Sequence, residues 1–156
     1  MHDETDDLGD RIAGMAASMD AACQRLLADL RRFDDELGWA RHGMLSCACW
    51  LSWRCGIALG AAREKVRVAH ALACLPLIDD ALACGQISYS KVRAMTRVAT
   101  PENEANLLQI ALHSTAAQLE KTCRIVLQLQ PRTGEGEAPP SRWLRVRDTD
   151  DGMVRI

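Results

Sequence analysis

The sequence has few aromatic residues and no long uninterrupted apolar run. Phenylalanine, tryptophan and tyrosine make up 4% of its 156 residues, whereas 48% are hydrophobic and 26% are charged. Strands favour aromatic and β-branched side chains, so an apolar content rich in alanine and leucine predicts an all-α fold. The longest apolar stretch, residues 71–78, contains Pro76 and is far shorter than the roughly 18 residues that a membrane-spanning helix needs. We therefore expect no membrane partner.

Motifs of common catalytic and metal sites are also missing. The sequence contains no G-x-S-x-G, no P-loop and no G-x-G-x-x-G, and its four histidines are dispersed. Cys47 and Cys49 are two residues apart, so on a helix their side chains point about 200° apart and cannot share a metal. We expect no catalytic residue, no metal site and no cofactor in this chain.

The cysteines and the first residues indicate a reducing compartment. Seven cysteines is an odd number, and the acidic start MHDETDDLGD does not resemble a secretory signal peptide. The sequence predicts free thiols and a cytoplasmic location.

The net charge of −2 hides a segregation of charge along the chain. Residues 1–38 carry ten acids and four bases, a net charge of −6, whereas residues 39–99 carry eight bases and three acids, a net charge of +5. A basic middle suits a polyanionic partner, although the acidic arm could instead fold back and mask it.

Apolar residues of the first part of the chain recur at alternating spacings of four and three. The pattern predicts a long amphipathic helix over residues 6–37 that ends at Gly38. Two interpretations remain open: the helix packs on its own domain, or residues 8–37 form the contact of a homodimer. The apolar positions are Leu8, Ile12, Met15, Met19, Ala22 or Cys23, Leu26, Leu30, Phe33 and Leu37.

Residues 46–73 read as a helix-turn-helix unit. Ser46 is a favourable N-cap for a short helix, and Gly56 supplies the left-handed conformation that ends it. The second helix has an apolar face and an outer face carrying Arg63 and Arg67, with Lys65 on its flank. Such a cationic helix face suits phosphates or base edges in a major groove, but it is also what a solvated helix looks like.

Further helices are predicted up to residue 129. One begins at Pro76 and is closed by Gly85. Another is capped by Ser88 or Ser90 and runs to Ala99, with an outer face of Arg93 and Arg97 and Lys91 on its flank. Thr100-Pro101 opens a third, and a capping box of Thr115 and Gln118 starts a fourth.

The composition changes after residue 130. Residues 131–141, PRTGEGEAPPS, read as a linker, and residues 142–156 read as a strand, an Asp-Asp-Gly turn and the start of a second strand. Since a two-stranded hairpin alone is marginal in water, we expect a truncated β segment and a polypeptide that is a piece of a longer protein.

The middle of the chain closely resembles domain of unknown function 222, the 13E12 repeat family, over residues 26–126. The matching landmarks are Gly38-Trp39, Cys47 to Trp53, Ala62 to Ala69, Leu75-Pro76, Gly85 to Arg97 and Thr115 to Leu119. The resemblance implies a helical N-terminal domain joined through a short β segment to an HNH endonuclease domain. It also implies that a divalent metal would belong to the nuclease domain, whose ligands we do not assign to any residue here.

These observations lead to two functional hypotheses of different classes. The first is a non-catalytic, helix-turn-helix-like domain of an HNH-nuclease-like protein that binds double-stranded DNA through Arg63, Lys65 and Arg67, with Lys91, Arg93 and Arg97 as further contacts. The second is a dimerisation or protein-interaction scaffold that uses the long first helix. Enzymatic activity, in either case, would belong to the full-length family rather than to this chain.

Overall fold

The computed structural model describes residues 4–129, 147–148 and 154–155. Over residues 4–129 the fold is all-α, as predicted. Its α-helices are α1 (Glu4–Asp35), α2 (Cys47–Cys55), α3 (Leu59–Ala71), α4 (Pro76–Ala83), α5 (Tyr89–Met95), α6 (Glu104–His113) and α7 (Ala116–Leu129), with 3-10 turns η1 (Gly38–His42) and η2 (Leu72–Cys74). No helix among the described residues is long and apolar enough to cross a membrane.

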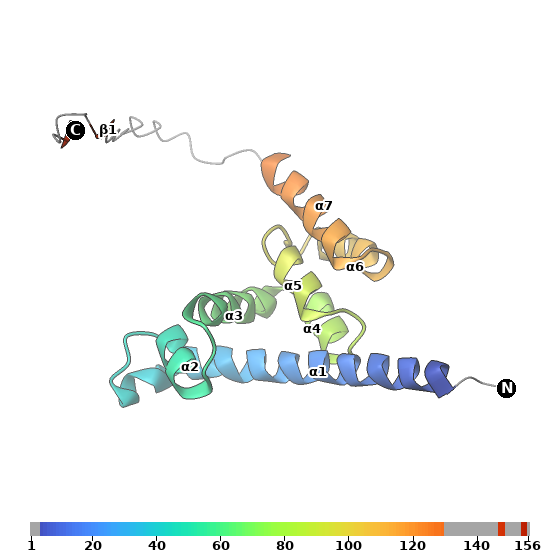
Figure 1. Ribbon diagram of the computed structural model, residues 1–156, viewed down its shortest axis with the longest axis horizontal. Coiled ribbons are helices and arrows are strands. Elements are labelled where there is room, and N and C mark those ends of the chain that lie inside the picture. The colour runs from blue at the N-terminus through green and yellow to red at the C-terminus, as the bar shows by residue number, and fades with distance from the viewer. Residues whose placement is uncertain (1–3, 130–146, 149–153, 156) are drawn as a thin grey trace.

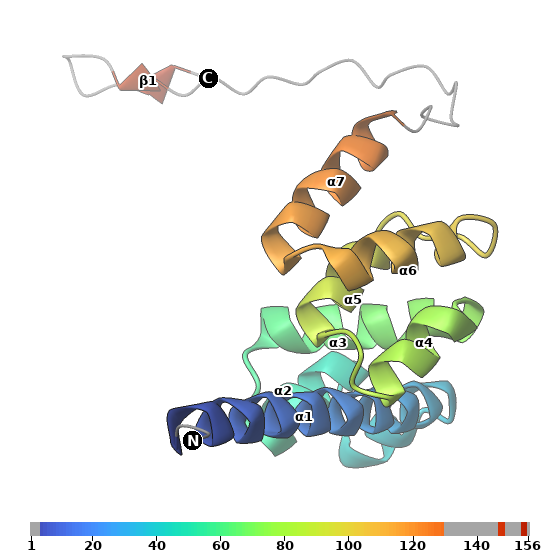
Figure 2. The same cartoon turned by 90° about the vertical axis from the view of Figure 1, so that its right-hand side faces the viewer.

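Helix α1 forms one long side of the molecule, and the remaining helices are stacked on it (Figure 1). Seen after a quarter turn, α3 and α4 lie above α1, α5 and α6 lie above these, and α7 is farthest away (Figure 2). Helix α1 ends two residues before the predicted end, because Leu37 takes a left-handed conformation with φ 52°.

The unit of α2 and α3 begins and turns as predicted. The Ser46 hydroxyl accepts a hydrogen bond from the backbone N–H of Cys49, and Gly56 ends α2 with φ 67°. Pro76 stands in the first turn of α4, and Ser88, rather than Ser90, caps α5 by accepting from the backbone N–H of Lys91. These local signals fix helix ends because each one satisfies backbone groups of the terminal turn.

Two further predicted boundaries are wrong. The helix after Ser88 ends at Met95 instead of Ala99, and the next helix begins at Glu104 instead of Thr100. The Asn103 side chain accounts for the gap: its oxygen accepts from the Thr100 N–H at 2.8 Å, and its amide donates to the Val98 carbonyl at 3.1 Å. An Asn that bonds nearby backbone in this way stabilises a turn instead of a helix. The Thr115 and Gln118 capping box is formed as predicted.

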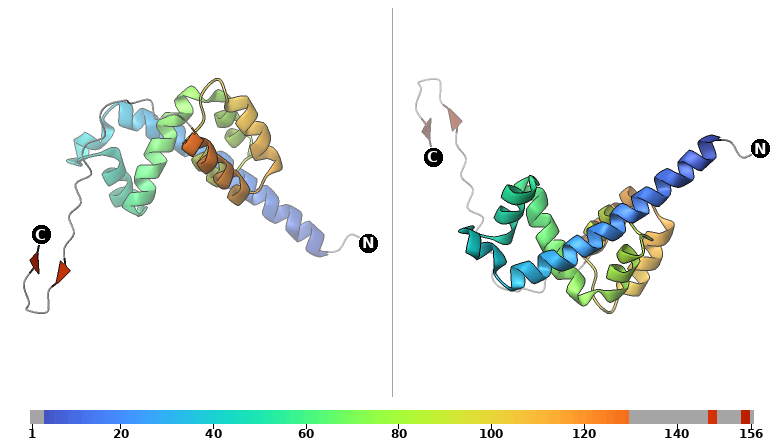
Figure 3. Two further views of the ribbon diagram at one scale, coloured as in Figure 1. Left: turned by 90° about the horizontal axis from the view of Figure 1, so that it is seen from above. Right: turned by 90° about the horizontal axis from the view of Figure 1, so that it is seen from below.

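Two apolar clusters form the core. The larger joins α1 to the helices from α3 to α7 around Leu27, Val68, Ile78, Met95 and Leu119. The smaller joins the end of α1 to α2 and α3 around Leu30, Cys47, Ala48, Leu51 and Ala62. The helices are therefore held as one body along the inner side of α1 (Figure 3).

Side chains from distant helices complete two helix starts. Glu104, which is buried, accepts a hydrogen bond from the Ile78 N–H at 2.8 Å, and Asp20 accepts from the Tyr89 N–H at 2.9 Å. A carboxylate at a helix N-terminus is favoured by the free N–H groups and by the helix dipole. Close approach also matters at the turn after α4, because a Cβ on Gly85 would lie 2.7 Å from the Ala17 carbonyl oxygen.

Strands β1 (Arg147–Asp148) and β2 (Val154–Arg155) pair antiparallel, with Arg147 opposite Arg155. The predicted linker at residues 131–141 and the Asp-Asp-Gly turn of the predicted hairpin lie outside the described residues.

Candidate nucleic-acid interface

Arg67 is held inside the domain by bonds to a neighbouring helix. Its guanidinium donates to the Thr96 carbonyl at 3.2 Å, to the Thr96 hydroxyl at 3.1 Å and to the Arg93 carbonyl at 3.2 Å. It also makes two hydrogen bonds to the Glu64 carboxylate, at 2.9 and 3.1 Å. Arg67 thus joins α3 to the C-terminal end of α5, where free carbonyls attract a cation.

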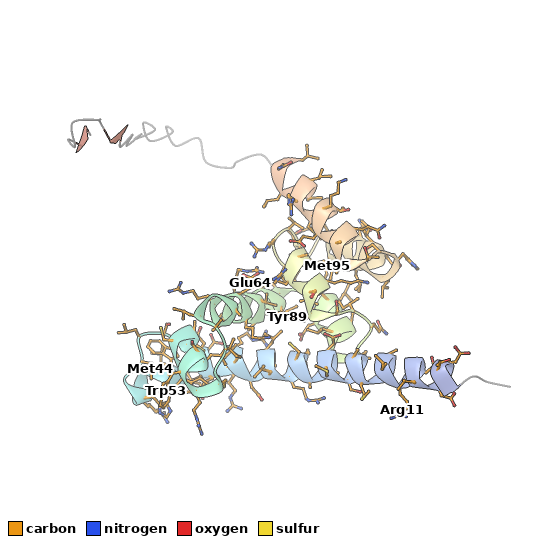
Figure 4. All side chains as sticks on the ribbon, viewed as in Figure 1. Arg11, Met44, Trp53, Glu64, Tyr89 and Met95 are labelled. Atoms are coloured by element: carbon orange, nitrogen blue, oxygen red, sulfur yellow. The ribbon has the colours of Figure 1, made fainter. Side chains whose placement is uncertain are left out.

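Glu64 binds two arginines at once. Besides Arg67, it receives Arg97 Nη2 at 2.7 Å, so one carboxylate bridges two guanidinium groups. Figure 4 labels Glu64 on α3. The pKa of Glu64 lies below its ordinary value, chiefly because Arg67 donates hydrogen bonds to the carboxylate. Partial burial acts in the opposite direction, and the positive charges of Arg67 and Arg97 lower the pKa further. Glu64 therefore stays ionised and keeps the two arginines close together.

The two predicted lysine contacts also have partners within the domain. The Lys65 ammonium lies 4.2 Å from the centre of the Tyr89 ring and 3.9 Å from the Cys23 sulfur. The Lys91 ammonium donates to the Ala111 carbonyl at 2.7 Å, near the C-terminal end of α6. A cation over an aromatic face and a cation at a helix C-terminus are both stabilising arrangements, so these lysines contribute to packing.

Three of the predicted contacts remain exposed: Arg63 on α3, Arg93 on α5 and Arg97 two residues after the end of α5. Within the part of the chain that the structure describes, the side chains of Arg63 and Arg93 form no hydrogen bond or ion pair, and Arg97 binds only Glu64. These three side chains are therefore the predicted contacts that face solvent most freely.

A cavity of about 330 Å³ lies between α5 and α7. One of its lining residues is Arg124, which was not among the DNA contacts predicted from the sequence. The cavity is lined by Arg93 and Arg97 from the α5 side, by Arg124 from α7, and by Glu120. Its floor is Ala94, Cys123 and Leu127. Three guanidinium groups against one carboxylate make this cavity cationic, and its size suits an anion as large as a phosphate.

Metal-ligating side chains do not converge anywhere in the described residues, where no group of three or more His, Cys, Asp or Glu could hold an ion. All seven cysteines are free thiols. His70 lies 2.8 Å from Asp34, which places it in a surface pair between α3 and α1. Trp39 donates to the same aspartate at 2.9 Å, and Trp50 packs against Phe33 with ring centres 4.4 Å apart and planes tilted by 45°, so both tryptophans have partners within the domain.

An all-helical domain with a cationic surface is thus the class that the fold and the site define. The family model described as "Domain of unknown function (DUF222)" matches residues 7–156, nearly the whole chain. The protein belongs to this family, as the resemblance predicted, and the match extends beyond residues 26–126 on both sides. Comparisons with curated proteins and with solved structures found no match.

Proposed function

We propose that this domain binds double-stranded DNA through the arginines exposed on α3, α5 and α7, mainly by neutralising backbone phosphates. The observation that carries the proposal is the convergence of Arg93, Arg97 and Arg124 on one cavity. A guanidinium fork matches the oxygens of a phosphate, and three such groups around a single opening provide more than a point charge.

Arg63 adds a further exposed cation, on α3. It stands one position before Glu64, whose carboxylate holds Arg97. That ion pair is exposed on the arginine side, so a phosphate can replace Glu64 as the partner of Arg97 at little cost. In this proposal the unit of α2 and α3 acts as the helix-turn-helix. Arg67, Lys65 and Lys91 hold helices of the domain together instead of contacting DNA.

The wider setting of the domain is part of the proposal and follows from the family resemblance. The domain would place an HNH-type nuclease on DNA in the cytoplasm, and the divalent metal and the catalytic residues would belong to that nuclease. Binding would be sensitive to salt and weak in sequence preference, because phosphate contacts carry little sequence information.

The test is fluorescence anisotropy of the full chain with a labelled mixed-sequence duplex at about 50 and about 200 mM salt. We expect binding at the lower salt that weakens steeply at the higher. The double variant Arg93→Ala, Arg124→Ala should lose at least about tenfold in affinity, and its salt dependence should fall by about two units of slope.

A matched variant and a gain-of-binding variant sharpen this test. Arg11→Ala with Arg41→Ala removes the same charge from exposed positions on α1 and η1, outside the proposed surface, and it should bind nearly like the parent. Glu120→Gln removes the carboxylate from the cavity and should tighten binding. Absence of binding at the lower salt, or an equal loss in both double variants, would rule out the proposed surface.

A further inference from the structure

The outward side of α1 carries an apolar stripe that no other described part of the chain covers. Its large side chains are between 41% and 73% exposed: Leu8, Ile12, Met15, Met19 and Leu26. A different side of α1 contacts the domain, where Gln24 binds Asp79 on α4 and Leu27 is buried in the main core. In the view from below, α1 runs across the front of the other helices, and its N-terminal part extends beyond them (Figure 3).

The stripe has the spacing of a coiled-coil seam. With the exposed Ala22 included, its six positions are separated by four, three, four, three and four residues. At 100° per residue they fall within an arc of about 80°, and they span about 27 Å of helix. A stripe this narrow and regular suits another helix laid along it, rather than a broad globular surface.

We propose that a second copy of this chain covers this stripe, with the two α1 helices packed antiparallel about a two-fold axis that crosses α1 at the level of Ala17, whose own side chain faces the domain. In this register the seam is complementary to itself. Leu8 lies opposite the partner's Leu26, Ile12 opposite the partner's Ala22, and Met15 opposite the partner's Met19. Every seam residue then meets another apolar residue, and the two-fold symmetry closes the assembly at two copies.

Charge on the flanks selects the antiparallel direction. Residues 6–10 carry three aspartates and no base, whereas residues 24–32 carry three arginines and one acid, Asp29. A parallel pair would place the two acidic segments together, and like charges at this separation repel. The antiparallel register instead places each acidic segment beside the partner's residues 24–28.

An apolar cavity continues the stripe at its C-terminal end. It measures about 360 Å³ between α1 and α2, and its apolar lining is Leu26, Leu30, Phe33, Trp50, Leu51 and Cys55. Because the partner's Leu8 lies opposite Leu26, it stands at the entrance of this cavity. The same contact occurs twice in the dimer. The interface therefore includes the contact between the two α1 helices and, at each end, a contact between α1 of one copy and the α1–α2 cavity of the other.

Sedimentation velocity of the full chain over a hundredfold range of concentration tests the association. We expect a monomer–dimer equilibrium, and we expect Ile12→Glu with Met19→Glu to weaken it by at least about tenfold. The matched variant, Ala13→Glu with Gly14→Glu, adds the same charge at exposed positions off the stripe and should associate like the parent. Leu30 is left unchanged because it is buried in the monomer.

A charge exchange tests the register. Met15→Glu alone and Met19→Lys alone should each weaken the dimer, because a lone charge would then face a methionine of the partner. The two changes in one chain should restore association, since each glutamate would then face a lysine. A parallel pair would show the reverse, with the double variant weaker than either single one.

Three results would overturn the inference: a monomer throughout the concentration range, equal association of the stripe variant and its matched control, or no recovery in the charge-exchange variant. Circular dichroism verifies that each variant stays helical. The stripe variants retain every arginine of the proposed DNA surface, so the dimer and the DNA proposal can fail independently.

Discussion

The Arg67 guanidinium makes two hydrogen bonds to Thr96, one to its carbonyl at 3.2 Å and one to its hydroxyl at 3.1 Å. The two residues stand 29 positions apart in the sequence, on α3 and just after α5. Arg67 therefore connects α3 to the end of α5, and its loss should destabilise the fold.

Arg67→Ala should lower the free energy of unfolding by about 2–3 kcal/mol, because several carbonyl and hydroxyl acceptors lose a charged donor. Arg67→Lys should recover little, since an ammonium cannot reproduce the guanidinium fork. Arg63→Ala, on the exposed side of the same helix, should stay within about 0.5 kcal/mol of the parent. Urea denaturation measures all three, and equal stability of the two alanine variants would contradict the assignment.

Glu64 should make stability depend on pH. Its pKa is lowered in the folded protein, so its carboxylate stabilises the fold above the ordinary pKa of a glutamate. This contribution is lost as the pH falls through that value toward the lowered one. Glu64→Gln should therefore be less stable than the parent at about pH 7, and the difference should shrink at about pH 3, as measured by urea unfolding at both values. A difference that is the same at both pH values would exclude this role.

Glu104 should be needed to hold α6 against the start of α4. Glu104→Ala leaves the buried Ile78 N–H without its acceptor and should cost about 1–3 kcal/mol in the free energy of unfolding. Glu104→Gln keeps an acceptor oxygen and should cost less. The neighbouring Glu102 is exposed, so Glu102→Ala is the control and should change stability little.

The thiols should differ in reactivity according to burial. Burial raises the pKa of Cys47 to about 11, and burial also raises the pKa of Cys123. Iodoacetamide reacts with the thiolate, so at about pH 8 it should modify the exposed Cys55, Cys74 and Cys84 first. Mass spectrometry of peptides measures the order. Cys47 should react only after urea unfolds the chain, and early labelling of Cys47 would contradict its place in the core.

Much of the fold was predictable because its signals are local. Ser46, Gly56, Pro76 and the capping box at Thr115 each act on backbone groups a few residues away. The two misplaced boundaries lie on either side of Asn103, whose side chain bonds Thr100 and Val98. The sequence does not specify which nearby backbone groups an asparagine in a polar stretch will bind, so these helix ends could not be predicted from it.

The candidate site was only partly predictable. The spacing of Arg63, Arg93 and Arg97 placed them on outer helix faces, where the structure has them exposed. Arg124 had no sequence signal, because only the packing of α7 on α5 brings it to the same cavity. The exposed stripe of α1 was visible as a heptad pattern, but a heptad pattern reads the same whether the seam faces its own domain or another chain.

The sequence alone determined most of the helices, the local caps such as Ser46 and Thr115, and the apolar faces, since each depends on residues within one or two turns of one another. Tertiary structure alone decided which cations are free and which apolar residues of α1 are covered. Lys65 meets Cys23 from 42 positions away, and Lys91 meets Ala111 from 20. Such partners come together only when the helices pack, because no periodicity within one helix specifies which neighbour its outer face will meet.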